Sequence, residues 1–521
     1  VSTVAGLDTT ARLETVGAVA VTVPKASASR AYETLRSDPA VGTVYYDRRV
    51  EVALDDANEV TTADEARAAF DVDGSGVTVA VLDTGVDDDH PDLRSAVTHE
   101  KDFTGEGTVE DRNGHGTHAA GIVAGRGNAS DGQYVGIAPN ASVMNLRVLD
   151  STGYGSSSDI IDAMEYADRR GADVVSMSLG GSTGSYDPFF YAVRELVSNG
   201  TTVIVAAGNS GPDYETVRSP GVVPEAITVG ATDDNDHIAR FSARGPTPFR
   251  GDVKPDLAAP GVYIRSAEAG TTGYVAKSGT SMATPVVSGA AALVLEEHPG
   301  WGPERVESAL VTTTDPIGYD VYTSGTGRLN ATAAVGTDLV VDDPVTTVGN
   351  LSAGVTRTTY LNLTNVGSTQ QTYSLSAGAT SLSGTTGNVS LNRSSVTLSP
   401  GETGAVALQV TTDTSDGTYS GRVEIGEDHT ASFGYVVSSK HTLSVEKLGI
   451  NDTAVDGDSV VLVDHDSGQS RTVSIDSSSS ADEGTVSVGV EGGTYTVYTG
   501  GTDESSGSPV LMGRTVSVDG D

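Results

Sequence analysis

The sequence contains no cysteine in its 521 residues, and aromatic side chains make up only 5% of it. Without cysteine the chain has no disulfide framework, no thiol nucleophile and no thiolate metal site. No apolar stretch reaches the roughly 18–20 residues that a transmembrane helix requires, so we expect no membrane span. The chain also opens at Val1 without a signal-peptide pattern, which we interpret as a processed or trimmed product.

Basic residues are scarce. The chain has 31 Lys and Arg residues against 70 Asp and Glu residues, and its formal net charge is -39. A nucleic-acid partner is not expected, because a polyanion would be repelled. Concentrated salt screens the self-repulsion of such a surface, so the composition predicts adaptation to high salt. An ordinary acidic secreted protein is the alternative interpretation.

The length suggests two to four domains, since one hydrophobic core rarely serves so long a chain. Residues 28–35 are predicted to form a helix, and residues 41–46 and 49–54 to form strands. We divide the chain into five segments: an α+β unit at 1–54, an exposed acidic linker at 55–65, an α/β domain at 66–336, a β-sandwich at 339–438 and a small β-domain at 441–521.

The segment 66–336 alternates apolar runs with helical patterns. Runs that are apolar nearly throughout are typical of parallel strands covered on both faces, and they occur at 77–82, 143–148, 174–179, 203–207 and 226–229. Amphipathic stretches at 158–169 and 188–198 predict helices between them. The fold class is therefore α/β, with a doubly wound and mostly parallel sheet.

Three short strings carry an acid, a base and a hydroxyl. Asp83 lies in VLDTG (81–85), His115 in NGHGTH (113–118) and Ser281 in SGTSMATP (278–285). A serine hydroxyl becomes a good nucleophile when a histidine accepts its proton, and a carboxylate orients that histidine. Any one string would be weak evidence, but the three together in this order predict a catalytic triad.

The predicted strands bring these groups together. Asp83 directly follows the strand at 77–82, residues 178–181 close the strand at 174–179, and Asn209 follows the strand at 203–207. The carboxyl ends of parallel strands meet at one edge of the sheet, where ligands bind. Asn209 is the candidate side-chain donor to the oxyanion, together with the backbone N–H of Ser281.

At these residues the chain resembles the subtilisin-like serine proteases over about 66–336. The strings DDDHPDL (87–93), SMSLGG (176–181) and VAAGN (205–209) add to the resemblance, and the acidic composition is similar to the haloarchaeal halolysin type. The resemblance implies a secreted, monomeric endopeptidase of broad specificity that acts on proteins through an acyl-enzyme and needs no cofactor for its chemistry.

The resemblance also assigns binding residues. Ser178, Leu179 and Gly180 on one side, and Gly153, Tyr154 and Gly155 on the other, are expected to flank an extended substrate. Ala206, Ala207 and Gly208 are expected to line a roomy, apolar pocket for the side chain before the scissile bond. Structural calcium is also implied, with Asp92 as a ligand, although the loop at 126–134 departs in length from the expected pattern.

Residues 1–54 resemble the C-terminal part of the family's inhibitory propeptide. Its tail, at 49–54, is expected to occupy the substrate cleft, which makes the propeptide an intramolecular inhibitor of a zymogen. We expect the chain to cut itself between about 54 and 65.

Simpler interpretations stand beside several of these predictions. His118, three residues after His115, suggests a metal pair, but a hydrogen-bonded structural histidine is the favoured interpretation. Residues 87–89 are either solvated surface or calcium ligands, and Asn-x-Ser/Thr triplets such as that at Asn350 leave glycosylation open. Two other functions are alternatives to an endopeptidase: a surface-attachment protein whose protease domain is inert, and an adhesin built on residues 339–521.

Overall fold

The structure is a computed structural model that describes residues 8–13, 18–22, 35, 55–183, 187–248, 250–412, 416–437, 440–447, 459–464, 470–474, 484–491, 493–502 and 509–518. The chain forms two compact units, Val1–Val52 and Ala53–Asp521. The first contains an antiparallel pair, β1 (Asp8–Leu13) and β2 (Ala18–Thr22). The helix expected at 28–35, apart from its helical Leu35, and the strands expected at 41–46 and 49–54 lie outside the described residues.

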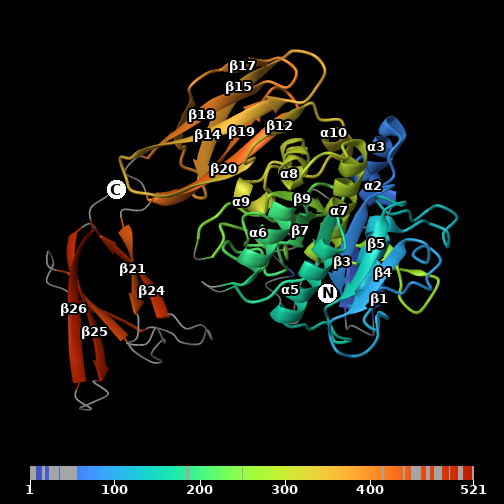
Figure 1. Cartoon of the computed structure of the whole chain (residues 1–521), viewed down its shortest axis with the longest axis horizontal. Helices are drawn as coiled ribbons and strands as arrows, with labels where there is room; N and C mark the ends of the chain where they lie inside the picture. Colours follow the sequence, from blue (N-terminus) through green and yellow to red (C-terminus); the bar gives the residue numbers. More distant parts are fainter. Residues whose placement is uncertain are drawn as a thin grey trace. The chain divides into compact units, whose positions relative to one another are not determined.

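The second unit is built on a seven-stranded parallel sheet with the order β4-β5-β3-β6-β7-β8-β9 (Figure 1). From β3 the chain crosses to the edge at β4, returns through β5, and then builds outward on the other side of β3. The predicted α/β class with a parallel sheet is confirmed. The strands are β3 (Thr78–Asp83), β4 (Val97–Asp102), β5 (Ser142–Arg147), β6 (Val174–Met177), β7 (Thr202–Ala206), β8 (Ile227–Thr232) and β9 (Leu257–Pro260).

Alternate residues of β3 enter two different cores. Val79 and Val81 belong to a core that includes α4 (His115–Ala124) and α7 (Thr280–Glu297). Ala80 and Leu82 belong to a second core, with α5 (Ser157–Arg169) and α6 (Phe189–Asn199). Because successive side chains of a strand point to opposite faces, helices cover both faces of the sheet. This double burial explains why the strand is apolar nearly throughout.

Small residues let the buried helix α7 lie close to its neighbours. A Cβ on Gly289 would stand 2.5 Å from the Cβ of Ile137, well inside van der Waals contact. The helix is buried along most of its length, so its alanine-rich and glycine-rich sequence reflects close packing.

The segment 55–65, predicted as an exposed linker, is helical instead. It forms α2 (Asp55–Val60) and the start of α3 (Ala63–Phe70). Ala57, Ala63 and Ala66 are buried in the first core, and the carbonyl of Thr61 accepts the N–H of Ala331 at 2.8 Å. The alanines that form the buried face are few and lie among acidic residues, so the sequence shows no clear helical pattern. The helix that packs against them, α10 (Ala331–Val335), lies far along the chain.

The remaining elements of this region complete the setting of the site. An antiparallel hairpin of β10 (Ile264–Ala267) and β11 (Tyr274–Lys277) leads directly into α7. The short helices α8 (Pro303–Thr312) and α9 (Val321–Ser324) follow. Among the described residues, no helix has both the length and the apolar character that crossing a membrane would demand.

The strands from β12 to β20 form two sheets, with the orders β12-β14-β18-β16 and β13-β20-β19-β15-β17, and both contribute to one hydrophobic core. Tyr322 donates from its hydroxyl to the carbonyl of Tyr419 at 3.2 Å, and Arg422 donates to the carbonyl of Gly325 at 2.8 Å. The strands are β12 (Leu339–Val341), β13 (Val345–Leu351), β14 (Thr356–Asn365), β15 (Gln371–Ser381), β16 (Asn388–Leu391), β17 (Ser395–Leu398), β18 (Thr403–Thr411), β19 (Gly417–Ile425) and β20 (His429–Val437).

The last strands form two further sheets, β21-β24 and β23-β22-β25-β26. The strands expected at 460–463, 484–490 and 494–498 fall within β22, β24 and β25. Their bounds are β21 (Lys440–Lys447), β22 (Ser459–Asp464), β23 (Ser470–Ser474), β24 (Gly484–Glu491), β25 (Gly493–Thr502) and β26 (Pro509–Val518).

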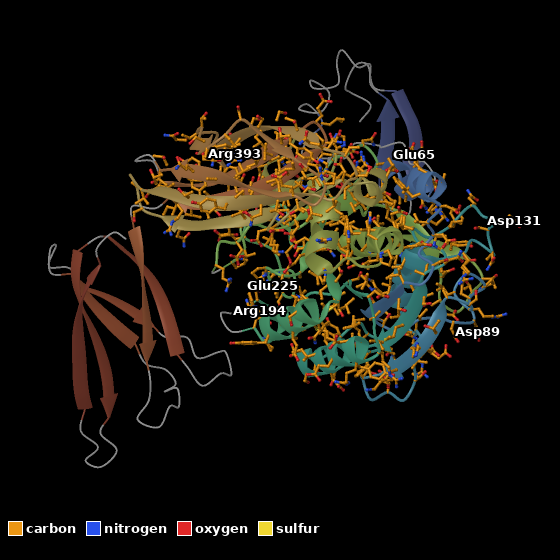
Figure 2. The ribbon with its side chains drawn as sticks, turned by 45° about the horizontal axis from the view of Figure 1, so that its top comes forward. Glu65, Asp89, Asp131, Arg194, Glu225 and Arg393 are labelled. Carbon is orange, nitrogen blue, oxygen red and sulfur yellow. The ribbon has the colours of Figure 1, made fainter. Side chains whose placement is uncertain are left out.

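Exposed acidic side chains mark the surface of the α/β region, among them Glu65, Asp89 and Asp131 (Figure 2). Asp89 lies 3.7 Å from the guanidinium of Arg94. Arg194 on α6 pairs with Glu225 at 2.7 Å, and it is one of the basic residues labelled in the same view. Such exposed pairs contribute little to stability.

Candidate active site

Asp83 and His115 are joined by a 2.7 Å hydrogen bond between Oδ1 and Nδ1. Asp83 ends β3 and is 1% exposed, while His115 begins α4. Because a carboxylate only accepts, Nδ1 of the imidazole carries the proton and Nε2 is left without one. The N–H of Thr84 also donates to Asp83 Oδ1, at 2.7 Å, and this second donor fixes the carboxylate.

The negative charge of Asp83 raises the pKa of His115 above its ordinary value. Burial of the ring and the nearby ammonium of Lys277 act in the opposite direction. Asp83 therefore stabilises the charged imidazolium. A histidine that acts as a base needs this stabilisation, because it takes up a proton during the reaction.

A buried carboxylate that we did not predict holds the turn before His115. Asp111 accepts the N–H of Gly114 at 2.7 Å and the hydroxyl of Thr84 at 2.8 Å, and its other oxygen accepts the N–H of Thr117 at 2.8 Å. The link to Thr84 connects the end of β3 to the start of α4. Asp111 stands two residues before the NGHGTH string, so nothing in the string itself indicates it.

Ser281 is the second residue of α7, where the positive end of the helix dipole favours a developing negative charge. Its carbonyl would normally accept the N–H of the residue four positions later, but that residue is Pro285, which has no N–H. The hydroxyl of Ser178 donates to the Ser281 carbonyl instead, at 2.8 Å. One serine of the substrate-flanking string thus supports the backbone of the candidate nucleophile.

Asn209 is held by its amide oxygen. Oδ1 accepts the N–H of Thr280 at 2.9 Å and the hydroxyl of Thr280 at 3.1 Å, which assigns the other position to Nδ2. A Cβ placed on Gly279 would lie 3.4 Å from Asn209 Nδ2 and 3.6 Å from the Ser281 nitrogen. Both predicted oxyanion donors therefore border the same small space beside Gly279.

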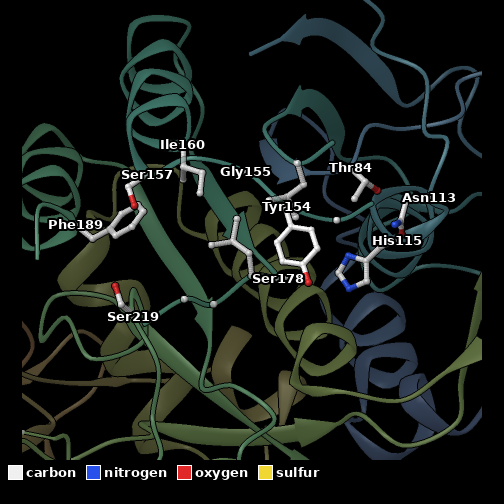
Figure 3. Close-up of a pocket in the computed structure, with 15 residues that line it drawn as sticks. Thr84, Asn113, His115, Tyr154, Gly155, Ser157, Ile160, Ser178, Phe189 and Ser219 are labelled. Carbon is white, nitrogen blue, oxygen red and sulfur yellow. The ribbon is translucent and has the colours of Figure 1, made fainter. Parts of the chain in front are cut away.

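Two cavities adjoin along residues 178–181. The first, about 420 Å³, contains His115 in its wall together with Gly153, Tyr154 and Gly155 (Figure 3). Leu149, Ile160 and Phe189 make its interior apolar. The second, about 470 Å³, is lined by Ser281, Asn209, Ala206 and Gly208 among others. Ser178, Leu179 and Gly180 border both cavities, so the structure brings the two predicted flanking strings together with the candidate catalytic groups.

The second cavity differs from the predicted apolar pocket in two respects. Ala207 does not line it, because its side chain points into a small hydrophobic core and is fully buried. Arg218 does line it, and adds a basic residue to a wall that we expected to be apolar. Arg218 follows Asn209 by nine residues in a loop, where no periodic pattern indicates which way a side chain faces.

The residues around Asp92 do not fit a calcium ion. Asp92 is buried, and its two oxygens accept hydrogen bonds from the Tyr274 hydroxyl at 2.6 Å and from the Ala129 N–H at 2.9 Å. Calcium needs six to eight oxygen ligands, whereas both oxygens of Asp92 are taken up by donors, and among the described residues no three acidic or histidine side chains gather to supply charge to a metal. Within 87–89, Asp87 accepts the N–H of Gly270 at 2.6 Å, whereas Asp89 is exposed.

His118 is a structural histidine, as the favoured interpretation had it. Its Nε2 lies 3.0 Å from the carbonyls of both Ile264 and Val275, so it donates to them and ties the β10–β11 hairpin to α4. Burial lowers the pKa of His118 to about 3, which keeps the ring neutral. The side chain is engaged away from His115, and the metal pair is not formed.

Residues 74–350, more than half of the chain, match the Subtilase family. The chain is similar to serine protease AprX of Bacillus subtilis, with 42% identity over 328 residues that cover 56% of this chain and 74% of that protein. It is also similar to subtilisin E of the same organism, with 42% identity over 265 residues that cover 50% of this chain and 66% of that protein. Among solved structures, sphericase matches with 34% identity and a TM-score of 0.46, over 51% of this chain and 96% of that one.

Proposed function

This chain belongs to the Subtilase family and is a serine-type endopeptidase, and we propose that Asp83, His115 and Ser281 carry out its chemistry. The observation that supports these roles most directly is the 2.7 Å hydrogen bond between Asp83 and His115, which leaves His115 Nε2 as the free base. The position of Ser281 at the start of α7, on the wall of the adjoining cavity, agrees with it.

The first half of the reaction forms an acyl-enzyme. Ser281 Oγ attacks the carbonyl carbon of the scissile peptide while His115 Nε2 accepts the hydroxyl proton. Asp83 holds the imidazole in the tautomer seen here and stabilises its charged form. The carbonyl oxygen becomes an oxyanion, and the N–H groups of Asn209 Nδ2 and of Ser281 donate to it. When the C–N bond breaks, His115 gives its proton to the leaving amine.

The second half reverses these roles with water. A water molecule attacks the ester carbon, His115 takes its proton, and the same two donors stabilise the second oxyanion. Breaking the ester bond returns the proton to Ser281 Oγ and releases the new carboxyl terminus. These steps use side chains and backbone only, so no cofactor takes part in the proposed chemistry.

Protein substrates are proposed to bind as an added strand. Residues 178–180 and 153–155 border the cavity that contains His115 (Figure 3), and an extended peptide between them would be held by main-chain hydrogen bonds. Residue side chains would then alternate between the enzyme and solvent. The exposed ring of Tyr154, at 78% exposure, would be covered by such a strand.

Residues 1–54 are proposed to be an inhibitory propeptide that makes the chain a zymogen. They resemble the family's propeptide, and residues up to Val52 form a compact unit of their own. We further propose secretion, a monomeric state and adaptation to high salt, the last on the net charge of -39. The region 339–521 is proposed to be accessory, a β-sandwich at 339–438 followed by a small β-domain at 441–521, and structural calcium is kept as a proposal.

A comparison of wild type with Ser281→Ala tests the proposed roles. We expect wild type to hydrolyse casein, to react with a serine-directed phosphonate at Ser281 and to lose about the first 54–65 residues, whereas the variant stays intact and inert. Equal processing of both proteins would contradict self-cleavage. An unlabelled, inactive wild type would favour the surface-attachment or adhesin functions.

A further inference from the structure

Arg218 brings a positive charge into the cavity next to Ser281. The cavity is lined by Ala206, Gly208 and Asn209 on one side and by residues 178–182 on the other. A Cβ built on Gly208 would lie 3.0 Å from Cγ of Arg218 and 3.3 Å from its Cβ, and one built on Gly180 would lie 3.5 Å from that Cβ. The stem of the arginine thus lies along two glycines, and the lack of a side chain at Gly208 makes room for it.

The backbone around Arg218 is fixed on both sides of the cavity. Its N–H donates to the carbonyl of Ala207 at 3.0 Å, and the carbonyl of the next residue, Ser219, accepts the N–H of Gly181 at 2.8 Å. The side chain is anchored by one hydrogen bond, from Nε to the hydroxyl of Ser210 at 3.2 Å. Within the part of the chain that the structure describes, the two terminal nitrogens of the guanidinium make no hydrogen bond, so they can meet a ligand.

No carboxylate neutralises this guanidinium. Among the described residues none lies within ion-pair distance of Arg218, although the chain carries 70 acidic residues against 31 basic ones. Other arginines of the same region, such as Arg194, Arg250 and Arg328, do have acidic partners. What sets Arg218 apart from those arginines is its place in the wall of the cavity that Ser281 also lines.

We propose that Arg218 selects substrates with an acidic side chain immediately before the scissile bond. The inference rests on the proposed function, because that side chain is attached to the α-carbon next to the carbonyl carbon that Ser281 attacks, and must enter the cavity beside Ser281 and Asn209. A guanidinium presents parallel N–H donors that match a carboxylate. The broad, apolar preference expected from Ala206 and Gly208 is replaced by a preference for glutamate or aspartate.

Charge and bulk make different predictions. If Arg218 only filled the cavity, small side chains such as alanine would be preferred, and glutamine would be cleaved as well as glutamate. If its charge selects, glutamate is preferred over the nearly isosteric glutamine. Since Arg218 is exposed, added salt would screen its attraction to the substrate carboxylate and reduce the preference for glutamate over glutamine.

The test uses fluorogenic peptides that differ only in the residue before the scissile bond, with Glu, Gln, Ala or Phe at that position. For wild type, at the lowest salt concentration at which phosphonate labelling shows full activity, we expect kcat/KM for Glu to exceed that for Gln about tenfold, equivalent to one close charge pair of roughly 1.4 kcal/mol. Arg218→Met, which keeps length without charge, should bring the ratio to about one. Arg218→Lys keeps the charge and should retain part of the preference for Glu. The control is Arg305→Met, at an exposed arginine that lines neither cavity, and it should leave the Glu/Gln ratio unchanged.

A wild-type ratio near one, or a ratio that persists in Arg218→Met, would overturn the proposal while leaving the endopeptidase intact. Phosphonate labelling of Ser281 counts active sites in every sample. Failure to cleave any of the four peptides or casein, with no labelling, would instead overturn the proposed function, and the selectivity with it.

Discussion

The hydroxyl of Tyr274 donates a 2.6 Å hydrogen bond to the carboxylate of Asp92 across 182 residues of sequence. This bond joins the loop after β3 to β11, the strand that leads into Ser281. The ring of Tyr274 also packs against Tyr134, with centroids 4.6 Å apart, and meets His90 edge to face at 5.7 Å. At Asp92, where the resemblance implies a calcium ion, the structure thus has a hydrogen bond and aromatic contacts.

Tyr274→Phe should destabilise the fold without creating a calcium requirement. Removing the hydroxyl leaves one oxygen of the buried Asp92 without its donor, at a cost of about 1–3 kcal/mol in the free energy of unfolding. Urea denaturation measures the loss, and Tyr360→Phe, at a residue that is 62% exposed, is the matched control. A calcium-dependent rise in the wild-type midpoint that disappears in Asp92→Asn would contradict this account.

The acid limb of the pH–rate profile should lie above the ordinary histidine pKa. His115 acts as a base when it is neutral, and Asp83 raises its pKa, so activity is lost as pH falls through that raised value. Removing the cation in Lys277→Met should move the limb of kcat/KM to still higher pH, because Lys277 opposes the charged imidazole. An unchanged or lower limb in this variant would contradict the assigned electrostatics.

The raised pKa of His115 stabilises the fold at low pH, where the enzyme is expected to be inactive. A histidine whose pKa is raised on folding stabilises the protein fully below its unfolded pKa, and the contribution disappears as pH rises through the folded pKa. Denaturation of wild type and His115→Gln should therefore show a difference in unfolding free energy that is larger at pH 5 than at pH 9. A difference that grows with pH would show that another group dominates.

Gly279→Ala should impair catalysis more than folding. The new methyl group would stand 3.4 Å from Asn209 Nδ2 and 3.6 Å from the Ser281 nitrogen, in the space proposed for the oxyanion. The backbone there is extended, with φ of 161°, so alanine introduces no backbone strain. We expect kcat to fall roughly 10²-fold, similar to losing one oxyanion donor, a magnitude established on subtilisin itself.

The control for this substitution is Gly300→Ala, because a Cβ at Gly300 meets nothing within 4 Å. Thermal midpoints of both variants should stay near that of wild type. A Gly279→Ala protein with normal kcat would show that the oxyanion lies elsewhere.

Ser178→Ala should weaken the support of Ser281, and a second substitution should restore it. The variant removes the 2.8 Å donor to the Ser281 carbonyl, which Pro285 cannot replace because it has no N–H. We expect a loss of about 1–3 kcal/mol and a lower kcat. In the background of Ser178→Ala, Pro285→Ala supplies an N–H four residues after Ser281 and should recover part of both losses.

A double-mutant cycle gives the coupling between these two positions. Pro285→Ala in the wild-type background should have a smaller benefit, because the carbonyl already has a partner. Additive effects on unfolding free energy would mean that Ser178 and Pro285 do not act on the same carbonyl.

Much of the fold followed from local patterns. Val79 and Val81 enter one core and Ala80 and Leu82 the other, and burial on both faces is what makes such a strand apolar nearly throughout. The segment 55–65 could not be predicted in this way, since its alanines are stabilised by α10, which lies far away in sequence.

The amino-acid sequence by itself determined the parallel sheet and the place of Asp83 and Asn209 at its carboxyl edge, because strand periodicity and strand ends are local properties. Tertiary structure alone decided that Tyr274 satisfies Asp92 and that Arg218 faces the cavity beside Ser281. The physical reason is that a side chain's partner is chosen among segments that meet after folding, and no spacing along the chain records which segments those are.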